Sequence, residues 1–220
     1  KGTVLSGKAF CNSGNPAYLA LLEGGMFFQG EPNAGGKPSI VCMADTGRIR
    51  RMSTLHLNRI PENGRQLVRL EPGETLVAAC MCCEASGVLI VSREGKGLHL
   101  EGQDLKAGFT PGGRLYDGMS VRNKDRAAIC IPYQRGNDVL ILTQNGKAVR
   151  LQETFELAPH KRGSFGAAIV RLDEGDQVLR AVRVSDAAVL LLSKEGRSLC
   201  VNLREIPTVR AAAKGVQTMS

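Results

Sequence analysis

The chain has 220 residues, of which 43% are hydrophobic, 23% are charged and 4% are aromatic. This composition is typical of a soluble globular protein, and no stretch approaches the ~18 to 20 consecutive apolar residues of a membrane span, so we expect no membrane association. The 29 Lys and Arg residues outnumber the 21 Asp and Glu residues, for a formal net charge of +8 and a pI near 9.3. This excess favours a polyanionic partner, provided that the cations recur in an ordered way.

The first 37 residues do not follow the pattern of the rest of the chain. Residues 1–10 lack the apolar run and small-residue cleavage site of a secretory signal. Two short apolar runs, 17–22 and 26–28, lie on either side of a Glu-Gly-Gly turn. We expect 1–37 to close or cap the fold, with 17–28 pairing as strands with 188–219.

Residues 38–220 contain one thirteen-residue pattern four times. Each copy begins with four apolar residues, continues through polar residues and has glycine at its eighth position. The copies are IVCMADTGRIRRM (40–52), VLIVSREGKGLHL (88–100), VLILTQNGKAVRL (139–151) and VLLLSKEGRSLCV (189–201), at offsets of 48, 51 and 50 residues. The apolar runs predict strands buried on both faces, and the glycines predict tight hairpin turns.

A second turn pattern recurs with the same period. Leu70-Glu71-Pro72-Gly73-Glu74 and Leu172-Asp173-Glu174-Gly175-Asp176 each precede a strand-like run, and Val121-Arg122-Asn123-Lys124-Asp125 has the equivalent position, 51 residues from each. Each repeat is thus expected to form four strands, with a basic loop before the third (68–70, 169–172). Four strands per ~50-residue repeat predict an all-β, propeller-like disc of about four to five four-stranded blades.

The predicted blades are 38–86, 87–137, 138–187 and 188–220, and the fourth copy ends before its last strand. The alternative is two unrelated β domains joined near 102–114. The unbroken register of both turn patterns disfavours it.

Basic residues recur at equivalent positions of the repeats. Arg48, Lys96, Lys147 and Arg197 directly follow the four hairpin glycines, and three positions further on are Arg51, His99, Arg150 and Cys200. Because alternate residues of a strand face opposite sides, both positions can reach one partner only if the first lies at an exposed turn tip or the strand is bulged. With the loop cations, the candidate nucleic-acid contacts are Arg48, Arg50, Arg51, Arg59, Arg65, Lys96, Lys106, Arg114, Lys147, Arg150, Lys161, Arg162, Arg197, Arg204, Arg210 and Lys214.

Around a disc these cations would form a belt, which suits curved double-stranded DNA. Some ~6 to 10 phosphate contacts would give strong and steeply salt-dependent binding, and they can offset the roughly 1 to 6 kcal/mol needed to bend the duplex. The scarcity of aromatic residues disfavours single-stranded nucleic acid, whose bases stack on aromatic side chains. The competing interpretation, which stays open, is a protein-interaction propeller whose basic rim is only solvated.

No pattern in the chain predicts a catalytic site, a metal site or a cofactor. Five of the seven cysteines lie in apolar runs (Cys42, Cys80, Cys82, Cys130, Cys200), which indicates core packing and a reducing, cytoplasmic setting. The cluster at 80–83 lacks the second CxxC pair or nearby histidines of a zinc site. Residues 31–39 resemble a phosphate-binding loop but have glutamate at the first glycine position, and no Ser, His and acid set recurs.

The hairpin, the basic loop and the L-x-x-G-[DE] turn together resemble the C-terminal β-pinwheel of bacterial type IIA topoisomerase A subunits. Residues 189–220 are similar to a late blade of the topoisomerase IV subunit, with Glu205-Ile206-Pro207 and Lys214-Gly215 at its characteristic positions. The Q-R-R-G-G-K-G box of gyrase subunits has only degenerate relatives at 160–166 and 210–215. The resemblance implies a non-catalytic, nucleoid-associated domain that bends duplex DNA along a basic rim for a catalytic core carried elsewhere in the subunit.

Overall fold

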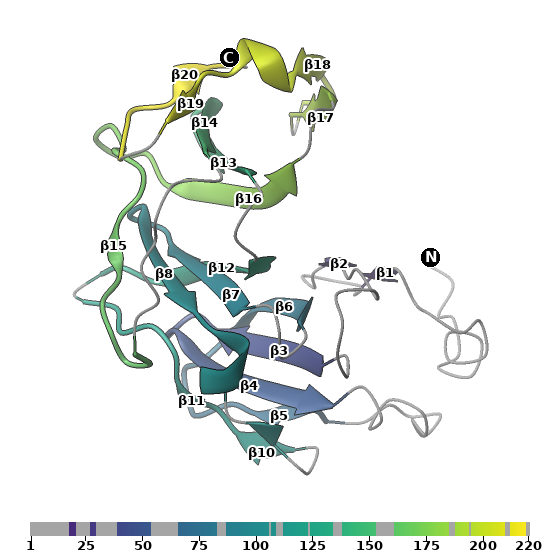
Figure 1. The fold of residues 1–220 in the computed structure, drawn as a ribbon, viewed down its shortest axis with the longest axis vertical. Helices are drawn as coiled ribbons and strands as arrows, with labels where there is room; N and C mark the ends of the chain where they lie inside the picture. Colours follow the sequence, from purple (N-terminus) through teal and green to yellow (C-terminus); the bar gives the residue numbers. More distant parts are fainter. Residues whose placement is uncertain are drawn as a thin grey trace.

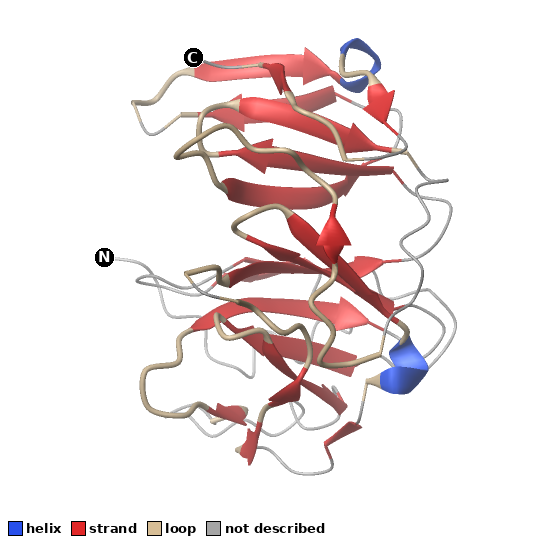
Figure 2. Cartoon of the chain, turned by 90° about the vertical axis from the view of Figure 1, so that its left-hand side faces the viewer, coloured by secondary structure: helices blue, strands red, loops and turns tan. Residues whose placement is uncertain are grey.

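In the computed structural model, the described residues are 18–20, 27–29, 39–53, 66–82, 87–105, 107–108, 112–122, 124–133, 138–152, 161–184, 188–193, 195–209 and 212–218. Their regular secondary structure consists of strands and two short 3-10 helices, which confirms the all-β prediction. The sheets follow one another along an arc (Figure 1) and are stacked from bottom to top in the side view of Figure 2. Within the described part of the chain, no helix is long and apolar enough to cross a membrane.

Each of the first three blades is built on three antiparallel strands from one repeat, with the first strand in the centre. Blade 1 contains β3 (Ser39–Ala44), β4 (Arg48–Ser53) and β6 (Leu76–Cys82). Blade 2 contains β7 (Gly87–Ser92), β8 (Lys96–Leu100) and β12 (Ala127–Tyr133). Blade 3 contains β13 (Asp138–Thr143), β14 (Lys147–Leu151) and β16 (Val178–Val184). The fourth repeat contributes β17 (Ala188–Leu192) and β18 (Ser198–Asn202).

The outer strand of each of these three blades also pairs with short strands from the following repeat. Blade 1 receives β9 (Ala107–Gly108) and β11 (Tyr116–Asp117), blade 2 receives β15 (Ala167–Ala168), and blade 3 receives β19 (Thr208–Val209) and β20 (Val216–Gln217). In addition, β5 (Val68–Arg69) pairs with β10 (Gly113–Arg114). We call the crossing residues (107–108, 112–117, 164–168, 208–209 and 212–217) the exchange segments.

Because of these exchange segments, a blade is not a contiguous stretch of sequence. Of the two predicted third strands, 68–70 is present as β5 but pairs with β10 of the following repeat rather than within its own blade. At the other, 169–172, only an isolated bridge from Val170 to Ala213 is found among the described residues. The chain instead crosses to the blade before it. Strands of two residues show no alternation of apolar and polar positions, so the sequence pattern could not reveal this crossing.

The central strand of an inner blade is buried on both of its faces. On β7, Val88 and Ile90 pack with residues of blade 1, whereas Leu89 and Val91 pack with residues of blade 3. All four side chains are fully buried. This position between two blades explains why the runs are continuously apolar, as predicted. A strand with one solvent-exposed face would alternate apolar and polar residues.

The fourth blade is covered on one face only. In the described part of the chain, β17 and β18 pair with each other and with no other strand. Val189 and Leu191 pack on the core shared with blade 3. Leu190 and Leu192 point the other way and are 63% and 71% exposed.

The N-terminal strands do not lie where the sequence suggested. In the described residues, β1 (Tyr18–Ala20) and β2 (Phe27–Gln29) pair with each other and make no ladder with 188–219. β2 lies near β6 of blade 1 (Figure 1). The rest of 1–37 falls outside the described residues, so its capping role stays a prediction.

Four of the predicted core cysteines are buried as expected: Cys42, Cys80, Cys82 and Cys130. The Sγ atoms of Cys80 and Cys130 lie 3.7 Å apart, one on β6 and the other on β12. Burial raises the pKa of the Cys42 thiol to about 12, with a smaller contribution from Cys130. Cys200 is exposed, so the packing prediction is wrong for this residue, which lies on the open fourth blade.

Candidate nucleic-acid interface

The four predicted hairpin turns are present. Gly47, Gly95, Gly146 and Gly196 have φ values of 81, 80, 77 and 81°, a region that glycine occupies without strain. Not all of these tips are free, however. A Cβ at Gly47 would lie 2.1 Å from the Met119 carbonyl oxygen, because the chain that follows the first exchange segment passes directly over this turn.

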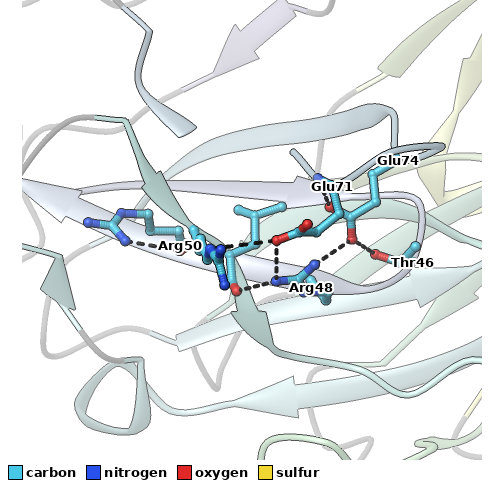
Figure 3. A network of polar contacts seen from close by, with 7 residues as sticks. Thr46, Arg48, Arg50, Glu71 and Glu74 are labelled. Atoms are coloured by element: carbon cyan, nitrogen blue, oxygen red, sulfur yellow. Dashed lines mark hydrogen bonds and ion pairs between the residues drawn. The ribbon is translucent and has the colours of Figure 1, made fainter. Parts of the chain in front are cut away.

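The cation that follows the first turn is bound within its own blade. Arg48 Nη1 lies 3.1 Å from Oε1 of Glu74, and Arg48 Nη2 donates a hydrogen bond of 2.8 Å to the Leu115 carbonyl (Figure 3). Burial disfavours the charged form of Glu74, but hydrogen bonds from the Glu71 N–H and from Thr46, together with Arg48, outweigh it. The pKa of Glu74 therefore lies below its usual value. Arg48 holds the two turns of blade 1 together.

A similar arrangement recurs in the next two blades. Lys96 Nζ lies 4.0 Å from Asp125, whose other carboxylate oxygen accepts hydrogen bonds from the N–H groups of Glu94 and Arg126. In blade 3, Asp176 accepts a hydrogen bond of 3.0 Å from the N–H of Asn145. The acidic residue that ends the second turn thus stabilises the hairpin turn of the same blade, which explains why the two turn patterns share one period.

Asp173 binds two cations from different repeats. It forms ion pairs with Lys147 of its own blade and with Lys214 of the following repeat, whose Nζ lies 2.8 Å from Oδ1. Hydrogen bonds from Lys147 and then from Lys214 lower the pKa of Asp173 to about 2. Two of the predicted DNA contacts therefore share one carboxylate.

Arg51 and Arg150, at the second basic position of their repeats, each form a hydrogen bond to the following repeat. Arg51 Nη1 donates a buried hydrogen bond of 2.9 Å to the carbonyl of Gly102, the first residue of the 3-10 helix η2 (Gly102–Asp104). Arg150 Nη1 donates one of 2.8 Å to Leu203, the first residue of η3 (Leu203–Glu205), and its Nε lies 2.6 Å from Asp138. These guanidinium groups satisfy helix carbonyls.

Arg50 is also buried. Its Nη1 donates a hydrogen bond of 2.9 Å to the Arg114 carbonyl, and its guanidinium lies 5.8 Å from the centre of the Tyr116 ring. Arg50 and Arg51 are only 4% and 5% exposed. The expectation that these two side chains reach a partner from the rim is wrong, since both face the neighbouring chain segments.

The remaining predicted contacts are at or near the surface. Arg114, Lys161, Arg197, Arg204 and Lys214 are exposed and Arg162 is half-buried. Arg114 lies 3.8 Å from Glu71 but keeps 69% of its side chain exposed. Arg59, Arg65, Lys106 and Arg210 lie outside the described residues.

The acidic residues that contact the hairpin turns and tip cations were missed as site residues. Glu74 and Asp125 pair with Arg48 and Lys96, whereas in blade 3 Lys147 pairs with Asp173 and Asp176 accepts from the Asn145 N–H. Glu74, Asp125 and Asp176 recur at offsets of 51 residues, at the end of a turn pattern that had itself been recognised. The similar periods of the cations and the acids indicate that the two sets recur together, but not which side chains meet.

Stacked blades that exchange strands along a chain define a β-propeller-like, or β-pinwheel, repeat domain. Residues 137–185 and 187–220 match the family of the DNA gyrase C-terminal domain, beta-propeller. The resemblance predicted from the sequence is confirmed: the chain is similar to the C-terminal domains of bacterial type IIA topoisomerase A subunits.

Two curated relatives are the DNA gyrase A subunits of Borrelia hermsii and Chlamydia trachomatis. Each is 23% identical, over 177 and 181 residues, and each match covers 79% of this chain. The chain spans only about a fifth of their length, 22% and 21%.

Two solved structures have the same fold. The DNA gyrase A C-terminal domain has a TM-score of 0.75 at 19% identity, covering 86% of this chain and 64% of that one. The E. coli ParC C-terminal domain has a TM-score of 0.62 at 15% identity, covering 87% and 88%.

Proposed function

We propose that this chain is a non-catalytic, DNA-binding accessory domain of a type II topoisomerase A subunit. It bends double-stranded DNA along its rim and presents a segment to a catalytic core in the rest of the subunit. In this role it works in the cytoplasm at the nucleoid. The observation that carries the proposal is the match to the gyrase C-terminal domain family, combined with an excess of cations in the fourth repeat, where residues 188–220 carry five basic and two acidic residues.

The arrangement of the exchange segments supports a contact with an extended polyanion. Each exchange segment lies on the outer strand of the preceding blade, and β15 runs along the left side of the arc in Figure 1. Cations carried by these segments or close to them therefore recur once per blade along one side of the molecule. The proposed contacts are Arg114, Lys161, Arg162, Arg197, Arg204 and Lys214, with Arg59, Arg65, Lys106 and Arg210 as further contacts on the loops outside the described residues.

The competing function is a protein-interaction propeller with a solvated basic rim. One observation favours it: Arg48, Lys96 and Lys147 are paired with carboxylates, so three of the four predicted tip cations are already neutralised. A rim with fewer free cations binds DNA less tightly, because affinity grows with the number of phosphates neutralised.

A salt titration with a fluorescently labelled random-sequence duplex tests the proposal. Six phosphate contacts predict a slope of about −5 for log K against log salt. Arg197→Glu with Arg204→Glu should weaken binding strongly, because both residues are exposed on the fourth repeat. The double variant Leu179→Glu with Arg180→Glu on β16, the edge strand of blade 3 opposite the exchange segments, serves as a control for added negative charge. A flat titration of the wild-type chain would assign the domain to a protein partner instead.

A further inference from the structure

Three exchange segments join the preceding blades through equivalent residues. Gly113, Ser164 and Ala213 pair with Val68, Met119 and Val170, respectively. The next residue of each exchange segment is therefore equivalent in the three joints, namely Arg114, Phe165 and Lys214. The turn residues three positions after Val68, Met119 and Val170 are also equivalent to one another. They are Glu71, Arg122 and Asp173.

The middle joint has the reverse chemistry of the other two. In the first joint Arg114 Nε lies 3.8 Å from Glu71, and in the third joint Lys214 pairs with Asp173. In the middle joint the exchange segment supplies an aromatic ring and the turn supplies the cation. Cζ of Arg122 lies 3.8 Å from the centroid of the Phe165 ring, which is a close cation–π contact.

The net charge of the turn changes sign in the same way. Residues 68–75 carry one basic and two acidic residues, for a net charge of −1, and 170–177 carry one basic and three acidic residues, for −2. Residues 119–126 carry three basic residues and one acidic residue, for +2. No ion pair is found for Arg122 or Lys124 among the described residues, and both are exposed. The middle joint therefore presents positive charge that the others neutralise.

The ring beneath Arg122 is held in place by its own loop. Gly163 N–H donates to the Gly118 carbonyl at 2.7 Å, and Ser120 Oγ donates to the Gly163 carbonyl at 2.7 Å. Gly166 has a φ of 69°, and a Cβ there would lie 2.4 Å from the Gly97 carbonyl oxygen. This close docking orients Phe165, and a guanidinium stacked on a fixed ring keeps the N–H groups at its edge available to an anion.

We propose that Arg122, stacked on Phe165, forms a phosphate-binding site for duplex DNA at the joint between blades 2 and 3. Lys124 on the same turn and Lys161 and Arg162, which precede Phe165 in the sequence, add positive charge around it. This joint then contributes more to DNA affinity than the other two, where the ion pairs of Arg114 and Lys214 partly neutralise the cation. This inference rests on the proposed function, and it adds two residues, Arg122 and Lys124, to the contacts predicted from the sequence.

The test compares Arg122→Gln with Arg180→Gln in the whole chain, by fluorescence anisotropy of a labelled duplex across a salt titration. Both variants lose one positive charge, and Arg180 is an exposed residue of β16. Arg122→Gln should weaken binding about eightfold at 0.1 M salt and reduce the salt slope by about 0.9, as expected for one lost phosphate contact. Arg180→Gln should change binding far less. Equal effects would overturn the inference but leave the proposed function intact, whereas a wild-type chain that binds no duplex would refute the proposed function itself.

A second variant separates the site from a general effect on folding. Arg122→Glu with Phe165→Lys gives the middle joint the ion-pair chemistry of the other two and has the same net charge as Arg180→Gln. Its thermal melt should stay close to the wild type while its DNA affinity falls at least as far as that of Arg122→Gln. Duplex binding as tight as that of Arg180→Gln would overturn the inference. Binding of poly-glutamate in place of duplex, lost in the same variant, would assign the site to an acidic protein segment.

Discussion

Arg51 and Gly102 are 51 residues apart in the sequence and are joined by a buried hydrogen bond of 2.9 Å, from the guanidinium of one to the carbonyl of the other. The contact links the outer strand of blade 1 to a 3-10 helix of the following repeat. Arg150 and Leu203 make the equivalent contact from blade 3. Arg51 and Arg150 therefore do not serve DNA binding. They join consecutive repeats to one another instead.

We expect Arg51→Met to destabilise the fold without changing the DNA contacts. The substitution leaves the Gly102 carbonyl without its donor, which costs about 1–3 kcal/mol, while the apolar stem of the side chain is largely kept. Urea unfolding measures this cost. The salt slope of DNA binding, measured on folded protein, should equal that of the wild type. A reduced slope would show that Arg51 reaches the nucleic acid after all.

The carboxylate of Glu74 should matter more for stability than a matched exposed one. Glu74→Ala removes the acceptor for Thr46, Arg48 and the Glu71 N–H, which predicts a loss of about 1–3 kcal/mol in the free energy of unfolding. Glu174→Ala removes an exposed carboxylate from the second turn of blade 3 and should leave the unfolding midpoint nearly unchanged. Similar effects of the two substitutions would mean that Glu74 does not hold the two turns of blade 1 together.

The Asp173 ion pairs should give the fold an acid-sensitive component. The pKa of Asp173 is lowered from 3.8 to about 2, so the folded state binds this proton less readily than the unfolded chain does. The resulting stability is present above the unfolded pKa and is lost as the pH falls toward the folded one. The difference in melting temperature between the wild type and Asp173→Asn should therefore be constant above about pH 5, shrink as the pH falls between the two pKa values and be small at about pH 2. Added salt should also reduce it, because the group is near the surface.

The docking of the third repeat's exchange segment should depend on a glycine. Both Gly166 and Gly175 have positive φ, and alanine at either position should cost about 1–2 kcal/mol in backbone strain. Only at Gly166 would the added Cβ also collide with the backbone, at the Gly97 carbonyl, whereas Gly175 has open space around it. Gly166→Ala should thus lower the melting temperature clearly more than Gly175→Ala, as calorimetry can measure. Equal losses would argue against the close approach of this segment to β8.

The two faces of the blades should respond differently to truncation. Leu89 is fully buried between blades 2 and 3, so Leu89→Ala should lower the free energy of unfolding by about 2–5 kcal/mol. Leu192 lies on the uncovered face of blade 4 and is 71% exposed, so Leu192→Ala should change it little. A large loss at Leu192 in denaturant titrations would indicate that this face is covered in solution.

Local features of the repeat could be predicted because they leave a local pattern. The continuous apolar run at 88–91 indicates a strand with two dry faces, and Gly95 after Glu94 indicates the tight turn. The tip cation Lys96 follows from the same alignment. What could not be predicted was its partner, because the pattern does not state that Asp125, 29 residues further on, lies beside it.

Sequence alone determined the repeat, its hairpins, the sandwiched strands and the family resemblance, since each depends on the order and period of neighbouring residues. Only the tertiary structure decided which cations are free. The two-residue exchange strands have no readable pattern, yet their crossing to the preceding blade buries Arg50 and Arg51, pairs Lys214 with Asp173 and places Phe165 under Arg122. The physical reason is that the burial and the ion pairs of a cation decide whether it can bind a phosphate. In this protein the residues that bury or pair these cations come from a different repeat.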